Sequence, residues 1–440
     1  MTDYSSEEQF IIDESLEMQS IEAGRWIYKI FKVFPVLKNR GFVIYFISLI
    51  ISNTGTWLQV VAQGWLVWKL TGSPLFVGII GAAATLPSLF LSLHGGVIVD
   101  RFSRRKILLI TQTTAMLCAF ALGGLTITNL VSIWHIMIIA LLLGCANAID
   151  MPARHAFNVD MVGKEELPSA TALSVITMNA ARVIGPSLAG IMIALVGIGG
   201  TFIINAISYL AVILVLFFVR PKFTKPFEQI HASAIKAIKN GLRYSWDHSL
   251  IRLLLALIGI IAIFAWQYLT ILPVVAETIF HTGASGLGYL FAAAGIGSII
   301  ASSIVSVYSK KINHLIFIIG GALLYTFGMF AFTAGHNLWL GLIFIFFCHA
   351  GLSFTLLTIL NSIQNLVEDN FRGRALSMFN LMIFGLAPLG NLILGFLSEH
   401  FSVGFALRFG AVILFISILY VILKRQKIKT LYIKYQTTSL

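Results

Sequence analysis

Charged side chains are scarce in this chain. Lysine, arginine, aspartate and glutamate make up 11% of its 440 residues, hydrophobic residues make up 58%, and the mean hydropathy is +0.91. A water-soluble domain of this size with such a composition would have to expose a very large apolar surface. The composition therefore excludes a soluble protein and indicates one that crosses a membrane several times.

Cysteine and catalytic motifs are also missing or rare. The three cysteines, Cys118, Cys145 and Cys348, lie in separate apolar runs, which argues against a disulfide framework and a metal knuckle. The chain has no phosphate-binding glycine loop, no zinc-protease helix motif and no nucleophile elbow. We therefore expect no enzyme activity, no cofactor and no metal site. Residues 1–22 contain seven acids and no lysine or arginine, so no cleavable signal is expected.

Long apolar runs recur along the whole chain, and each is long enough for a bilayer core that needs roughly 20 helical residues. They show no alternation typical of a membrane β-barrel, so the fold class is predicted to be all-α. We count twelve such runs, at about 42–68, 75–99, 107–128, 133–153, 169–197, 200–219, 251–280, 284–307, 315–333, 338–364, 375–398 and 404–423.

The net charge of +12 is distributed along the chain in a regular way. If the termini and every second loop are cytoplasmic, all but three of the 30 lysines and arginines fall on that side. The exceptions are Lys69, Arg182 and Arg408. This bias predicts that both termini are cytoplasmic, and it argues for orientation in a membrane rather than binding to nucleic acid.

The polar segment from Arg220 to Ser249 divides the twelve runs into six and six. We expect a cytoplasmic segment with an interfacial helix at 1–40, helix bundles at 41–220 and 251–424, a linker with an amphipathic helix at 221–250, and a basic tail at 425–440. Weak repetition relates the halves, since Gly185-Pro186 and Ala387-Pro388 interrupt corresponding helices. Related halves with matching Gly/Pro breaks are typical of secondary transporters.

The most informative motif is Gly96-Val97-Ile98-Val99-Asp100-Arg101-Phe102-Ser103-Arg104-Arg105. It resembles the G-x-x-x-D-R-x-G-R-R/K loop of the major facilitator superfamily, with serine at the second glycine position. Further stretches resemble its enterobactin-exporter-like and drug-efflux branch, the transmembrane secretion effector type. These are Gly55-Thr56-Trp57-Leu58-Gln59, Asp150-Met151-Pro152-Ala153-Arg154 and Arg372-Gly373-Arg374.

The resemblance implies a cytoplasmic gate, in which Asp100 faces the N-terminus of the eleventh helix near Phe371 to Arg374. A helix dipole favours a negative charge there by up to ~2 kcal/mol. The predicted gate residues are Gly96, Asp100, Arg101, Arg104, Arg105, Asp150, Arg154, Arg372 and Arg374. The alternative is that these basic residues only fix the orientation of the chain.

The fifth apolar run contains Ala181-Arg182-Val183-Ile184-Gly185-Pro186-Ser187-Leu188-Ala189-Gly190. It resembles the G-x-x-x-G-P-x-x-G-G pattern of the superfamily's proton-coupled exporters, with alanine at two glycine positions, and so implies export through Arg182, Gly185, Pro186 and Gly190. Small residues let helices approach closely and proline bends a helix. Generic close packing is the alternative interpretation.

Polar residues inside the helices are predicted to line the transport pathway, because lipid-facing amides and charges are penalised. The predicted cavity residues are Asn53, Gln59, Gln63, Asn179, Arg182, Gln267, Asn361 and Gln364. Any amide among them has interhelical hydrogen bonding as its alternative role. Arg182 lies about 13 residues into its helix, roughly 20 Å deep, and either faces an anionic substrate or is tied to helix-end carbonyls.

No carboxylate falls at the middle of an apolar run, where a proton carrier is expected. The candidates for proton coupling are Asp150, Glu277 and His349, and for His349 the alternative is a hydrogen-bonded packing residue. Proton antiport is therefore implied mainly by the resemblance.

These observations predict a monomeric secondary transporter of a bacterial cytoplasmic membrane. It exports a small amphiphilic molecule, a siderophore or a drug-like compound, by alternating access and against protons, with membrane lipids as its surroundings. An importer of a nutrient or metal chelate with the same fold is one alternative. A membrane receptor or assembly factor that transports nothing is another.

Overall fold

The structure is a computed structural model that describes residues 33–219, 221, 248–308, 314–367 and 369–426. The side chains of residues 92–97, 100 and 369–374 lie outside this description. Every regular element among the described residues is a helix, so the all-α prediction is confirmed for them. Ten helical stretches in this part of the chain are long and apolar enough to cross a membrane.

The first half of the chain folds into four long helices after a short turn of 3₁₀ helix. These are α2 (Arg40–Thr71), α3 (Pro74–Arg101), α4 (Arg104–Ile127) and α5 (Ile133–Phe218). Asn39 and Ser73 cap α2 and α3, because each side chain accepts a hydrogen bond from a backbone N–H in the first turn. Gly72 adopts a left-handed conformation and ends α2, so α3 begins two residues later.

Helix α5 contains two sharp breaks at glycines. It has 86 residues, about 130 Å at 1.5 Å per residue, which is several times the thickness of a bilayer core. Gly163 and Gly197 have φ of 77° and 73°, a backbone conformation that only glycine adopts readily. The breaks divide α5 into residues 133–162, 164–196 and 198–218, close to the predicted runs at 133–153, 169–197 and 200–219.

The second half of the chain is more interrupted than the first. It comprises α7 (Ser249–Ile260), a π-helical turn η2 (Ile261–Ala265), α8 (Tyr268–Thr278), α9 (Gly283–Tyr308), α10 (His314–Phe332), α11 (Leu338–Leu366), α12 (Asp369–Gly385), α13 (Ala387–His400) and α14 (Val403–Leu423). The predicted runs at 251–280 and 375–398 are therefore each broken once. The second break lies at Leu386, two residues before Pro388, whereas α5 continues without a break through Pro186.

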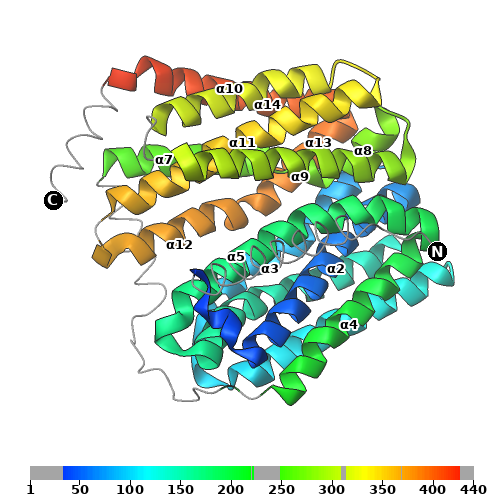
Figure 1. Ribbon diagram of the computed structural model, residues 1–440. Coiled ribbons are helices and arrows are strands. Elements are labelled where there is room, and N and C mark those ends of the chain that lie inside the picture. Colours follow the sequence, from blue (N-terminus) through cyan, green and yellow to red (C-terminus); the bar gives the residue numbers. More distant parts are fainter. Residues whose placement is uncertain (1–32, 220, 222–247, 309–313, 368, 427–440) are drawn as a thin grey trace, which may run out of the picture.

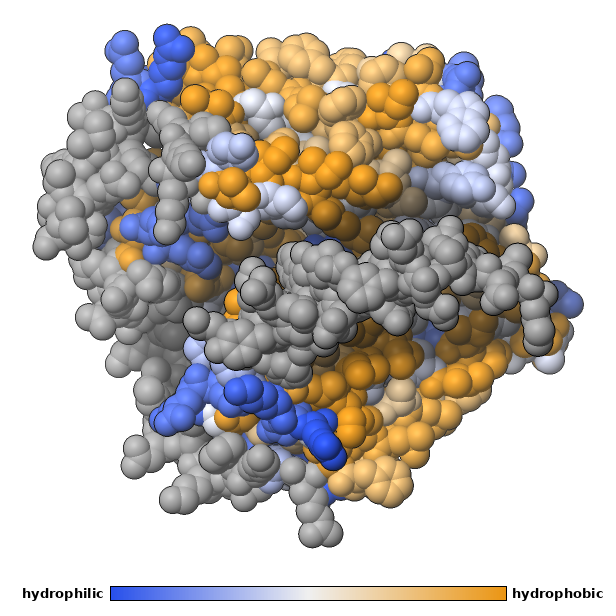
Figure 2. Space-filling view, viewed as in Figure 1, coloured by the Kyte–Doolittle hydropathy of each residue, from blue (hydrophilic) through white to orange (hydrophobic). Residues whose placement is uncertain are grey.

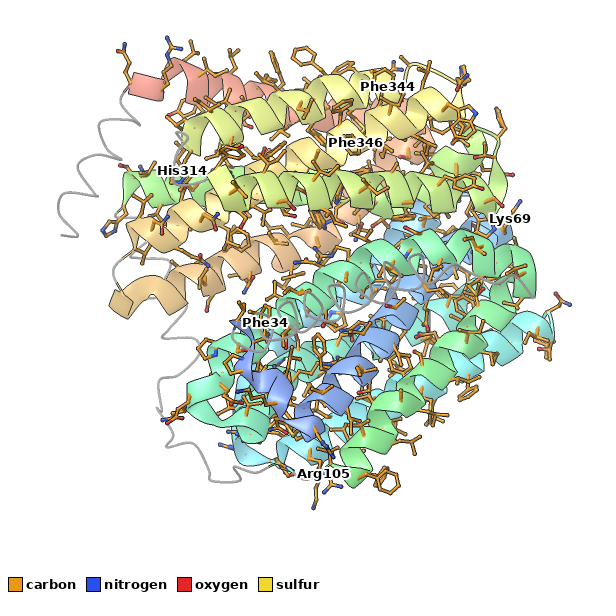
Figure 3. All side chains as sticks on the ribbon, viewed as in Figure 1. Phe34, Lys69, Arg105, His314, Phe344 and Phe346 are labelled. Atoms are coloured by element: carbon orange, nitrogen blue, oxygen red, sulfur yellow. The ribbon has the colours of Figure 1, made fainter. Side chains whose placement is uncertain are left out.

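Helices α2 to α5 form one half of the molecule and α7 to α14 form the other (Figure 1). The halves contact each other through three main helix pairs, α3 with α13, α5 with α9, and α2 with α8. We call the end that carries Gly72 the Gly72 end, and the end that carries the α3–α4 turn the Arg101 end. Figure 1 shows the halves together at the Gly72 end and diverging toward the Arg101 end, and Figure 3 labels Lys69 and His314 at opposite ends.

The outer surface matches a membrane environment. Large apolar side chains such as Ile44, Ile47 and Leu195 are exposed along the helices. Figure 2 shows hydrophobic residues across the middle of both halves, with hydrophilic residues gathered mainly toward the two ends. Most of the predicted interfacial helix before residue 40, the amphipathic linker helix and most of the basic tail lie outside the described residues.

Candidate functional site

The two halves meet at the Gly72 end through glycines. Gly190 of α5 packs on α9, where a Cβ atom would come 2.5 Å from the Ala284 carbonyl oxygen and 3.0 Å from the Gly288 Cα. Gly78 of α3 packs on α13 in the same way, 3.0 Å from the Cα of Gly395 to an added Cβ. Backbones therefore touch at two crossings, and only residues without side chains permit this approach.

Polar contacts join the halves at the same end. The Glu399 carboxylate of α13 accepts hydrogen bonds from the Ser73 hydroxyl at 2.7 Å and from the Leu75 N–H at 3.3 Å. Glu399 thus places its charge at the N-terminus of α3, where the helix dipole favours it. Lys69 Nζ lies 3.4 Å from Glu277 Oε1, with side chains 50% and 36% exposed, so this pair contributes at most about 1 kcal/mol.

The π-helical turn shapes the middle of the second half. The Trp266 N–H donates to the Ile261 carbonyl five residues earlier, which adds one residue to the turn. Gln267 Nε2 donates to the Ala262 carbonyl at 3.1 Å. Gly390 and Gly410 accommodate this bulged backbone, since a Cβ at Gly390 would lie 2.7 Å from the Ile263 carbonyl oxygen. Trp266 is thereby fixed at the end of the turn.

Arg182 lies between the two halves and contacts an indole from each. Its guanidinium carbon is 5.2 Å from the Trp57 ring centroid in α2 and 5.6 Å from the Trp266 ring centroid. Its Nε atom is buried, and among the described residues it has no hydrogen-bond acceptor. A charge at this depth costs at least ~2.5 kcal/mol, and each cation–π contact returns about 0.5–2 kcal/mol.

Gly185 explains why Arg182 reaches Trp57. A Cβ atom at Gly185 would lie 2.6 Å from the Thr54 carbonyl oxygen and 2.6 Å from the Trp57 Cβ. Helix α5 therefore lies directly on the backbone of α2, one turn away from Arg182. Two glycines of the predicted export motif thus have different partners, because Gly185 packs within the first half and Gly190 packs across the interface.

His349 of α11 is buried beside this arrangement. Its Nδ1 atom and the Tyr268 hydroxyl share a hydrogen bond of 2.5 Å, and its ring lies 5.8 Å from the Trp266 ring. The Tyr325 hydroxyl donates to the Ala265 carbonyl at 3.1 Å, next to the π-helical turn. His349 is thus buried, hydrogen-bonded to Tyr268 and packed near Trp266.

A buried polar network occupies the first half. Arg154 forms an ion pair with Asp150, one turn before it in α5, and its Nη1 donates to Asn53 Oδ1 at 3.2 Å. Asp150 also accepts from the Thr111 hydroxyl at 2.7 Å and from Gln112 Nε2 at 2.8 Å. Arg154 therefore contacts both Asp150, which was predicted for the gate, and Asn53, which was predicted for the cavity.

The remaining predicted cavity residues are dispersed. Gln59 is buried and its Oε1 accepts from Asn205 Nδ2 at 2.5 Å, and Gln267 serves the π-helical turn. Gln63 is buried in α2, whereas Asn179 is exposed. Asn361 and Gln364 are half-buried in the last turns of α11. Arg182, from the same set, contacts an aromatic ring from each half.

At the Arg101 end, the described gate residues contact the first half. Arg104 pairs with Asp160 of α5, and Arg105 donates from Nη2 to the Phe217 carbonyl at 2.7 Å, near the end of α5. Arg101 is exposed. The side chains of Gly96, Asp100, Arg372 and Arg374 lie outside the described residues. Neither Asp160 nor the bridging role of Glu399 was predicted from the sequence, because their partners are 56 and 326 positions away.

Comparisons with known proteins identify the family. The model of the family described as transmembrane secretion effector matches residues 32–433. The staphyloferrin A transporter of Staphylococcus aureus is 27% identical over 362 residues, covering 82% of this chain and 90% of that protein. The multidrug efflux pump Tap of Mycolicibacterium fortuitum is 24% identical over 373 residues, with 82% and 90% covered.

Two further likenesses agree with this match. The enterobactin exporter EntS of Shigella boydii is 26% identical over 248 residues, covering 56% of this chain and 54% of that one. A bacterial homologue of the human lysosomal transporter Spinster, solved in an inward-facing conformation, superposes with a TM-score of 0.69 at 11% identity, covering 91% and 98% of the two chains. The chain therefore belongs to the transmembrane secretion effector family of the major facilitator superfamily, and it is a multi-pass transporter of the bacterial inner membrane rather than an enzyme.

Proposed function

We propose that this chain exports a small amphiphilic molecule, of siderophore or drug type, by alternating access. The observation that carries the proposal is the arrangement of the two halves. At the Gly72 end the halves are joined by the close helix contacts at Gly190 and Gly78, which we call the glycine crossings, and by the Glu399 contacts. The helices diverge toward the Arg101 end (Figure 1). A molecule built this way can expose a central site to one side of the membrane at a time.

The proposal includes a topology. The three stretches of α5 each cross the membrane once, which gives twelve crossings, six within 41–220 and six within 251–424. Residues 221–250 join them on the cytoplasmic side, and both termini are cytoplasmic, as the distribution of lysine and arginine favours. The Gly72 end then faces outward, so the described conformation is closed to the outside. The chain acts as a monomer.

Protons are the proposed coupling ion, with Asp150, Glu277 and His349 as the candidate sites. Export is supported by the similarity to two relatives, an enterobactin exporter and a multidrug efflux pump. Neither relative fixes which molecule this chain carries.

Transport in inside-out vesicles tests both the direction and the coupling. With staphyloferrin A and enterobactin as probes and an acidic vesicle interior, we expect accumulation of at least one probe above its external concentration. A protonophore should abolish this accumulation, because the pH gradient is the proposed energy source. Vesicles that lack the protein are the control.

Two results would contradict the proposal. Uphill uptake by right-side-out vesicles instead would make the protein an importer. Accumulation that persists under the protonophore would remove proton coupling and leave the direction standing.

A further inference from the structure

We propose that Arg182 binds the acidic group of the transported molecule, so that the central site takes carboxylate-bearing amphiphiles in preference to neutral or cationic ones. This inference rests on the proposed transport function and names its substrate class. It starts from the position of Arg182, which lies between the two halves with one indole from each half against its guanidinium group.

The Arg182 guanidinium group has no oxygen acceptor in the described part of the chain. No hydrogen bond or ion pair is present there for its side chain, and the buried Nε atom has no acceptor. The aromatic faces of Trp57 and Trp266 attract the cation, but they do not accept its N–H bonds in the way that an oxygen does. An oxyanion would supply the missing acceptor.

A guanidinium group favours one kind of anion. Its N–H donors lie in one plane and match the two oxygens of a carboxylate in a forked pair of hydrogen bonds. The two indoles provide apolar surface on which the rest of an amphiphilic ligand can pack. No described carboxylate forms an ion pair with Arg182, so the positive charge of Arg182 would repel an ammonium group that approaches the indole faces.

The position of the indoles links binding to the transport cycle. Trp57 and Arg182 belong to the first half, whereas Trp266 belongs to the second and is fixed by the π-helical turn. If the halves tilt against each other, the distance from Arg182 to Trp266 changes while the contact with Trp57 persists. The apolar surface beside the guanidinium is therefore complete only in some conformations, and the affinity for the acid depends on conformation.

Three fluorescent probes test the inference, because they share the dansyl group and end in an acidic, a neutral or a basic group. These are dansylglycine, its neutral amide, and dansyl-ethylenediamine, whose binding to the purified protein is followed by energy transfer from tryptophan. We expect the wild-type protein to bind the acid at least tenfold more tightly than the amide or the amine. Arg182→Gln should lose this preference, and Arg182→Lys should keep part of it, because a charge without the fork remains.

The control is Lys106→Gln, which removes one positive charge from an exposed position at the Arg101 end. It should keep the full preference for the acid, and size-exclusion profiles and Tm values show whether each variant is folded. Equal binding of the three probes by the wild type, no binding of the acid, or an unchanged preference in folded Arg182→Gln would overturn the inference. Export of a probe in the vesicle assay without an acid preference would refute the inference and leave the proposed function intact.

Discussion

Gly190→Leu is expected to reduce transport to background while the protein remains folded. A leucine side chain at this position would meet the Ala284 carbonyl and the Gly288 backbone of α9, and backbone atoms cannot rotate away as side chains do. The second half would have to move away at the Gly72 end, so the closed conformation would be lost. Accumulation of a transported probe in inside-out vesicles, which corresponds to export from the cell, measures the effect.

Gly320→Leu is the matched control, because Gly320 lies on α10 with open space where its Cβ would be. It should keep transport within about twofold of the wild type, since leucine is a good helix former and nothing is displaced. A cysteine at buried Ser398 of α13, in a background without the native cysteines, reports closure. A membrane-impermeant maleimide should label it faster in Gly190→Leu. Normal export by that variant would show that the glycine crossing is dispensable.

Arg154→Met is expected to destabilise the protein by about 3–5 kcal/mol, because it leaves the buried Asp150 carboxylate without its ion-pair partner. Thr111 and Gln112 would still donate hydrogen bonds to Asp150, but no positive charge would compensate it. The free energy of unfolding, measured in one detergent for all variants, checks this expectation.

The double variant Asp150→Asn with Arg154→Met is the matched comparison. It removes both charges, so it should recover at least half of the lost stability. If Arg154→Met unfolds within about 1 kcal/mol of the wild type, or the double variant is no more stable than the single one, Asp150 is not held by Arg154.

The sequence predicted most of the helices, because apolar runs of bilayer length have few alternatives to a membrane-spanning helix. It ended the fourth run at residue 153, whereas the helix continues to residue 162. The polar residues Asp150 and Arg154 suggested an end there. In the fold they form an ion pair with each other, and Arg154 also donates to Asn53 within the first half. A run of polar residues predicts a helix end only when no partner is available elsewhere, and such partners are invisible in a local pattern.

The same reason limits prediction of the site. Arg182 stood out by its type and depth, but its two indoles come from residues 125 positions before and 84 after it along the chain. The expected alternative, contacts with helix-end carbonyls, is absent for Arg182 among the described hydrogen bonds. Gln59 was predicted to line the pathway, yet it is bonded to Asn205, 146 positions away. Residue type identified the polar positions, and the tertiary fold decided which of them are bonded to one another.

The π-helical turn means that the number of residues between Ser249 and Thr278, as well as their type, decides which contacts this stretch makes. One extra residue in a helix turns everything after it by about 100° around the axis. Deleting one residue within Ile261–Ala265 would restore ordinary helix and rotate Tyr268 away from His349 and Glu277 away from Lys69. A single inserted residue therefore sets two contacts at different depths, one buried and one at the Gly72 end.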